Sequence, residues 1–156
     1  MKLCPQLRRL SGEHGRWLAE LARSGPGGEE GRAARLLRLW DAEILPRCRL
    51  EEEVLIPELA RHLSEADAVV VFTLGDHVAL RALARELRRA RGVERGKALV
   101  ALERKLAQHV GFEERTLFPV LQETLGCEEL ARLAAELGRA GRAAGAQSVP
   151  AGRSTK

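Results

Sequence analysis

His109 and Glu113 are the first residues in this sequence that suggest a ligand-binding site. They lie four residues apart, a spacing that places both side chains on one face of an α-helix, about one turn apart. Leu102, Leu106 and Leu117 fall on the same face and indicate that it is buried. Because a buried charge is costly unless it is paired, protonated or bound to a metal, an imidazole and a carboxylate in this apolar stripe predict a metal site.

The segment that contains Glu113 has an earlier copy in the chain. The sequence LEEEVLIPEL, which includes Glu51, is repeated as FEERTLFPVL 62 residues further on. The copy aligns Glu51 with Glu113, and this second glutamate supports the metal site. The copy fails at one position, because the residue that corresponds to His109 is Arg47.

Helical periodicity predicts the elements that would position these residues. Apolar residues recur at helical spacing over four ranges, residues 5–23, 29–62, 64–91 and 94–125. A capping-box pattern at Ser64 opens the third helix, Pro46 should kink the second, and residues 127–137 could form a short fifth helix. This pattern predicts an all-α, antiparallel up-down-up-down four-helix bundle. Its inner faces contribute five polar residues near the middle of their helices, at similar depth: His14, Glu51, His77, His109 and Glu113.

The composition indicates one helical domain with a basic tail. Leucine, alanine, arginine and glutamate dominate, and only 3% of the 156 residues are aromatic. We expect residues 1–137 to form the bundle and residues 138–156 to be a disordered tail. From Arg139 onward there are four basic residues and no acidic ones, which leaves 22 basic against 22 acidic residues in the rest. Because the net charge of +4 resides in the tail, we expect no nucleic-acid partner.

The cysteines and the hydropathy suggest a compartment. Cys4, Cys48 and Cys127 are odd in number and widely spaced, which fits free thiols in a reducing compartment. No apolar run approaches the roughly 20 residues needed to span a bilayer, so we expect no membrane partner. These features predict a cytoplasmic protein.

Several polar residues near the predicted site are expected on the surface instead. Glu52, Glu53 and Glu114 follow the two central glutamates and should face solvent. His62 lies near a helix end and should also be exposed.

Four motifs together make the chain similar to a known family. Glu13-His14 lies in the first helix and Asp76-His77 in the third, Glu-Glu-x-x-Leu-Ile/Phe-Pro occurs in the second and fourth, and His-x-x-x-Glu lies in the fourth. Over residues 7–125 the chain resembles the hemerythrin-like, or HHE cation-binding, domain. The doubled Glu-Glu element is the more specific part of the resemblance.

The resemblance implies a pair of non-haem iron ions in the bundle core. The ligands that it implies are His14 for the first iron, His77 and His109 for the second, and Glu51 and Glu113 as bridges. The family's second-helix histidine would fall at position 47, where this chain has arginine.

Arg47 leaves the first metal position open to several interpretations. An arginine stays protonated and cannot ligate a metal, and it could pair with Glu43 or Glu51, each one turn away, which would leave a single iron. Alternatively, Glu43 could ligate in place of the missing histidine, or the Pro46 kink could turn Cys48 inward as a thiolate ligand. We expect the second position, with two histidines and one or two carboxylates, to bind metal more tightly.

Three kinds of function follow from the resemblance and from Arg47. The leading hypothesis is an iron protein that binds or senses dioxygen or a related small diatomic molecule. The second is a redox enzyme acting on peroxide or nitric oxide, or a protein that stores or delivers iron. The third is a metal-free structural bundle, because Arg47 removes one expected ligand. The sequence leaves the choice between a binding protein and an enzyme open.

Overall fold

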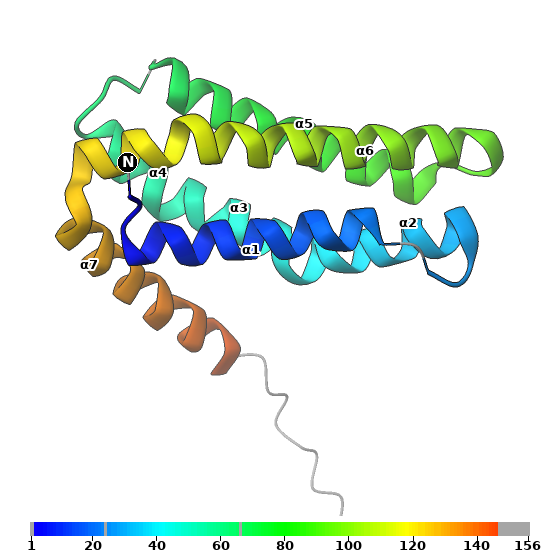
Figure 1. The fold of residues 1–156 in the computed structure, drawn as a ribbon, viewed down its shortest axis with the longest axis horizontal. Coiled ribbons are helices and arrows are strands. Elements are labelled where there is room, and N and C mark those ends of the chain that lie inside the picture. The colour runs from blue at the N-terminus through cyan, green and yellow to red at the C-terminus, as the bar shows by residue number, and fades with distance from the viewer. Residues whose placement is uncertain (1, 24, 66, 147–156) are drawn as a thin grey trace, which may run out of the picture.

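The computed structural model describes residues 2–23, 25–65 and 67–146, and every regular element in these ranges is helical. Four long helices form an antiparallel bundle, as expected (Figure 1). The first is α1 (Pro5–Ala22) and the third is α5 (Ala68–Arg89). The second is a continuous helical run of five segments: α2 (Gly28–Leu39), η1 (Trp40–Ile44), α3 (Leu45–Leu50), η2 (Glu51–Leu55) and α4 (Ile56–Ala60). The fourth consists of α6 (Gly92–Phe112), η3 (Glu113–Leu117) and the first turns of α7 (Phe118–Ala146).

The start of α5 differs from the predicted capping box. Asp67, and not Ser64, is the N-cap residue, and its carboxylate accepts a hydrogen bond from the Val69 amide at 2.9 Å. The Asp67 amide in turn donates to the Ser64 carbonyl in a turn before the helix. Because an aspartate satisfies a free amide of the first turn directly, it fixes the helix start three residues later than the sequence pattern suggested.

Three π-helical turns interrupt the second and fourth helices, and each ends two residues before a proline. The turns η1, η2 and η3 precede Pro46, Pro57 and Pro119 respectively. In each turn an amide reaches back five residues, for example from Phe118 to the Glu113 carbonyl. A proline has no amide hydrogen to donate in the helix interior, and a local widening to π geometry accommodates this loss. Pro46 therefore produces a π turn at the place where a kink was predicted.

Two apolar clusters fill the core, one on each side of a layer of buried polar residues. Along α1, Leu7 belongs to one cluster and Trp17 to the other, with His14 between them. The Trp40 cluster consists of Trp17, Ala33, Leu36, Trp40, Ile44, Cys48, Leu80, Ala84, Leu87, Ala98, Leu99, Leu102, Leu106 and Val110. The Phe118 cluster consists of Cys4, Leu7, Ile56, Leu59, Val70, Leu117, Phe118, Leu121 and Leu130. Each fully buried leucine contributes about 1.5–3 kcal/mol to folding, so these clusters hold the polar layer in place from both sides.

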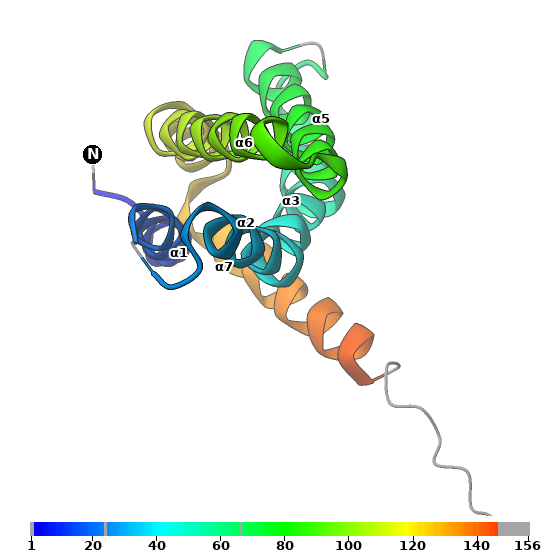
Figure 2. The same cartoon turned by 90° about the vertical axis from the view of Figure 1, so that its right-hand side faces the viewer.

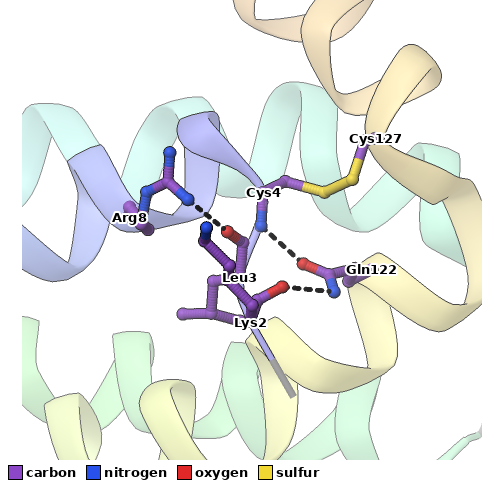
Figure 3. Close-up of a disulfide and its surroundings, with 6 residues drawn as sticks. All are labelled: Lys2, Leu3, Cys4, Arg8, Gln122 and Cys127. Atoms are coloured by element: carbon purple, nitrogen blue, oxygen red, sulfur yellow. Dashed lines mark hydrogen bonds between the residues drawn. A yellow bond between two sulfur atoms is a disulfide. The ribbon is translucent and has the colours of Figure 1, made fainter.

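A disulfide joins the start of α1 to α7 at one end of the bundle, so the prediction of three free thiols is wrong. Cys4 and Cys127 are bonded across a sequence separation of 123 residues (Figure 3), and Cys48, the third cysteine of the sequence, is free. Gln122 supports the link, because it accepts a hydrogen bond from the Cys4 amide at 2.6 Å and donates one to the Lys2 carbonyl at 3.1 Å. The wide spacing misled the prediction, because cysteines far apart in sequence are brought together when α1 and α7 pack side by side. With two of the three cysteines bonded to each other, the cysteines no longer support a reducing compartment.

The C-terminal helix is longer than predicted. Gly126, with a φ of 75°, turns the chain sharply within α7. The part that follows leaves the bundle at an angle (Figures 1 and 2). Helix continues to Ala146, beyond the expected end at residue 137, because alanine and arginine in this stretch are strong helix formers. The rest of the predicted tail, residues 147–156, lies outside the described residues. Within the described ranges, no helix is long and apolar enough to cross a membrane.

Candidate metal centre

Five buried polar side chains form the layer between the two apolar clusters. The exposed fractions are at most 2% for all five, which are His14 of α1, Glu51 of η2, His77 of α5, His109 of α6 and Glu113 of η3. Figure 2 views the bundle from its end and shows the helices that carry them arranged around a common axis. The bundle thus brings the five predicted residues to one depth.

Four of these residues offer ligand atoms that converge. In Glu51, His77, His109 and Glu113, one ligand atom of each residue lies within 4.8 Å of the others. His77 Nε2 faces Glu51 Oε2 at 3.3 Å, and His109 Nε2 faces Glu113 Oε1 at 3.1 Å.

Unpaired atoms in this group test whether it fits a metal. Glu51 Oε2, His77 Nε2, His109 Nδ1 and Glu113 Oε1 are all buried and have no hydrogen-bond partner. A buried polar atom without a partner costs about 1–3 kcal/mol, so these four atoms are unfavourable by themselves. A cation coordinated between them would satisfy several of them at once. The donor set, with two imidazoles and two carboxylates, fits a divalent metal ion.

His14 lies in the same layer but outside the converging group. Its Nε2 lies 2.9 Å from Glu113 Oε2, and its Nδ1 lies 2.8 Å from Glu114 Oε1. Its ring also stacks on Phe118, with 5.3 Å between the ring centroids. Both nitrogens are thus engaged with carboxylates, and Glu113 connects His14 to the group of four.

Carboxylates outside the group of four contact the buried histidines. Two of these carboxylates, Glu52 and Glu114, were predicted to face solvent, and that prediction is wrong. Glu52 Oε1 lies 2.8 Å from His77 Nδ1, and Glu114 holds His14 in the same way. Glu52 also accepts hydrogen bonds from the two terminal guanidinium nitrogens of Arg81, at 2.7 and 2.8 Å. Such carboxylates fix the tautomer and the ring orientation of metal-binding histidines. The repeat contained this signal, because it aligns Glu52 with Glu114 as well as Glu51 with Glu113.

Asp76 performs a related role for His109, which the Asp-His motif alone did not reveal. Its Oδ2 lies 3.5 Å from His109 Nδ1, and its Oδ1 accepts a hydrogen bond from the Lys105 ammonium group. Asp76 is itself only 5% exposed. Each of the three buried histidines therefore has a carboxylate beside its Nδ1.

Arg47 and Glu43 do not reach the converging group. Arg47 pairs with Glu13 of α1, and not with Glu43 or Glu51 as predicted. It also lines a pocket of about 540 Å³ between α1, α3 and the C-terminal part of α7. Glu43 has a half-exposed side chain and accepts a hydrogen bond from the Trp17 indole at 3.0 Å. The π turn η1 directs Glu43 toward α1, so this side chain does not replace the missing histidine.

Cys48 does face the interior, as the Pro46 alternative required. Its side chain is 1% exposed and free of disulfide bonding. With His77 and His109 it forms a second group in which the three ligand atoms lie within 4.8 Å of one another. Burial, followed by the charges of Glu51 and Glu113, raises the pKa of the Cys48 thiol far above its ordinary value of 9.0.

The charges in the layer are balanced around Glu113. Burial opposes ionisation of this carboxyl, but the neighbouring His109 and His14 outweigh it and hold its pKa well below 4.5. Burial likewise lowers the pKa values of both histidines, but the carboxylates beside them outweigh it, and both values lie above 6.5. Burial raises the pKa of Glu51 to about 7, and the neighbouring charge of Glu113 adds to the rise.

Comparison with known proteins gives one match. The family described as the hemerythrin HHE cation binding domain matches residues 3–121. No curated protein and no solved structure matches the chain significantly. The matched range contains all four helices of the bundle and every residue of the buried polar layer. With a helical bundle, a histidine and carboxylate group in its core and a match over most of its length, the chain belongs to the hemerythrin HHE cation-binding domain family.

Proposed function

We propose that the protein binds a single iron ion through His77, His109, Glu51 and Glu113, and that the iron takes up dioxygen or a related small diatomic molecule. The observation that carries this proposal is the convergence of ligand atoms from four buried residues, each of which also has a buried polar atom without a hydrogen-bond partner. Two histidines with one or two carboxylates are a donor set that suits ferrous iron and leaves coordination positions open.

The first metal position of the family is proposed to be lost in this chain. His14 is the one histidine near it, and it lies outside the converging group of ligand atoms. Arg47 replaces the second histidine, and its guanidinium is paired with Glu13. The fixed positive charge at this side of the layer disfavours a second cation nearby.

The surrounding residues support small-ligand binding rather than the binding of a large substrate. Glu52 and Asp76 orient the two imidazoles, and the Trp40 and Phe118 clusters keep bulk water away from the layer. When bound, iron supplies an open coordination position and a reversible one-electron couple. Because the layer lies buried between these two clusters, a large substrate would not reach the ligand atoms.

The test is to load the protein anaerobically with ferrous iron and to expose it to air. We expect oxygen-dependent absorption changes in the wild type and in His62→Ala, because His62 is half exposed and far from the layer. His77→Ala should lose both the iron and the response. Iron that is bound but unchanged by air would exclude the dioxygen claim, and turnover of added peroxide or nitric oxide would then identify an enzyme. Protein that retains no iron would be the metal-free structural bundle.

A further inference from the structure

Cys48 is a core residue that the family pattern gives no role. It lies in α3, three residues before Glu51, and it is almost fully buried. We propose that Cys48 is a thiolate ligand of the metal ion held by His77 and His109. This inference rests on the proposed metal binding, and it makes the centre a mixed thiolate, imidazole and carboxylate site.

The placement of Cys48 follows from the two sides of the second helix. Arg47 and Cys48 both lie about one turn before Glu51, but about 100° apart around the helix axis. Arg47 points toward α1, where it meets Glu13. Cys48 instead lies beside the histidines of α5 and α6. The side of the layer with Arg47 has thus lost a ligand, and the side with Cys48 has an additional one.

Two further observations favour Cys48 as a metal ligand over Cys48 as a small apolar core residue. The Cys48 sulfur lies within 4.8 Å of a ligand atom of each histidine. His77 Nε2 is buried without a hydrogen-bond partner, and neither histidine is more than 2% exposed. The repeat places Val110 at the position that corresponds to Cys48, and Val110 is also buried. An aliphatic residue therefore fits the same depth of the helix, so packing alone does not require a thiol.

A thiolate would change the chemistry of the centre. A thiol that coordinates a metal is deprotonated, and soft sulfur favours iron, cobalt and zinc over magnesium, calcium and manganese. One thiolate and two carboxylates carry three negative charges, which match a trivalent ion. We therefore expect Cys48 to stabilise the ferric form relative to the ferrous form.

The test uses cobalt(II) as the probe in the full chain without reductant. Cys4 and Cys127 are bonded to each other, so a thiolate-to-cobalt charge-transfer band in the near ultraviolet reports Cys48. The wild type should bind about one cobalt ion per chain and show the band, and Cys48→Ser should bind cobalt without it. Val110→Ser is the matched control, a hydroxyl at the corresponding depth of the fourth helix, and it should keep the band.

A second measurement on the wild type alone guards against misfolding of the variant. X-ray absorption of the zinc-loaded protein should contain a sulfur scatterer at about 2.3 Å, in addition to nitrogen and oxygen at about 2.0–2.2 Å. Bound metal with no sulfur scatterer and no charge-transfer band would overturn the thiolate ligand and leave the metal site intact. Failure of every form to bind cobalt, zinc or iron would overturn the metal site itself, and the thiolate with it.

Discussion

Glu113 is the residue on which the charge balance of the metal-free layer depends. It lies between His14 and His109, at 2.9 and 3.1 Å, and its depressed pKa keeps it ionised. Its stabilising contribution is present above pH 4.5 and is lost only as the pH falls through its lower folded pKa. Glu51, His14 and His109 have the opposite sign, because their folded pKa values are raised. Their contribution is complete below the unfolded values and is lost as the pH rises through the folded ones.

The free energy of unfolding of the metal-free protein should therefore fall as the pH is raised from about 5 to about 8. The rise of the Glu51 pKa from 4.5 to about 7 accounts for on the order of 3 kcal/mol of this change. Urea denaturation in the presence of a chelator measures it, and Glu51→Gln should flatten the dependence. A stability that is constant over this interval in the wild type would disprove the charge balance.

Glu52 is a positioning residue whose effect can be measured separately from folding. Its carboxylate holds His77 Nδ1 and is itself held by Arg81. Glu52→Gln should lower metal affinity by about 10–100-fold, the usual cost of losing such a partner. Glu53→Gln is the matched control, because Glu53 is the exposed neighbour in the same turn. Equal metal affinities in the two variants, measured by competition with a chelator, would show that Glu52 does not orient the histidine.

Sequence reasoning found the buried layer because its residues combine a motif with helical periodicity. His14, Glu51, His77, His109 and Glu113 each lie on an apolar stripe, and burial of these stripes was predictable. The partners of Arg47, Glu52 and Glu114 were not predictable. These side chains lie at the edge of a helix, and the neighbouring helix decides which groups they contact. The repeat does align Glu52 with Glu114, but only the packing of α5 against η2 and of α1 against η3 reveals their histidine partners.

At the scale of the elements, the π turns position the two central glutamates. Glu51 opens η2 and Glu113 opens η3, and both turns precede a proline by two residues. The prolines were visible in the repeat, but their effect was predicted only as a kink or a loosened turn. A π turn inserts one residue into the helical phase, and π turns occur often at functional sites.

Pro119→Ala tests whether the π turn η3 positions Glu113. The new amide would allow normal α-helical bonding over Glu113–Leu117, which would rotate the glutamate away from the histidines. Metal affinity should fall about tenfold or more, while the thermal stability of the metal-free protein should not fall, because alanine is a better helix former than proline. Pro5→Ala is the control, because Pro5 opens α1, nine residues before His14, and precedes no π turn. Equal affinities in both variants and the wild type would refute this role.

At the scale of the whole molecule, the disulfide links the start of α1 to the part of α7 that follows Gly126. Neither cysteine lies near the polar layer, so the link should act on stability and not on the site. Its sequence separation could not be interpreted before the packing of α1 on α7 was known. The four-helix architecture, in contrast, was predictable, because each helix carries its own apolar stripe and two of the three breaks between helices contain glycine.

Reduction of Cys4–Cys127 should lower the free energy of unfolding by about 2–4 kcal/mol, because the unfolded chain loses a long covalent loop. Thermal denaturation of Cys48→Ala with and without reductant measures this effect, since that variant contains only the disulfide cysteines. Metal content should stay unchanged on reduction. If the wild type is unfolded without reductant and three free thiols are titrated, the Cys4–Cys127 disulfide is contradicted.

The central claim is that Glu51, His77, His109 and Glu113 hold one metal ion in the buried layer. Elemental analysis of protein purified from iron-supplemented cells tests it most directly, with Glu113→Gln and the surface variant His62→Ala alongside. The account predicts about one iron ion per chain in the wild type and in His62→Ala, and a large loss in Glu113→Gln. About two ions per chain, no metal at all, or equal contents in all three proteins would contradict it.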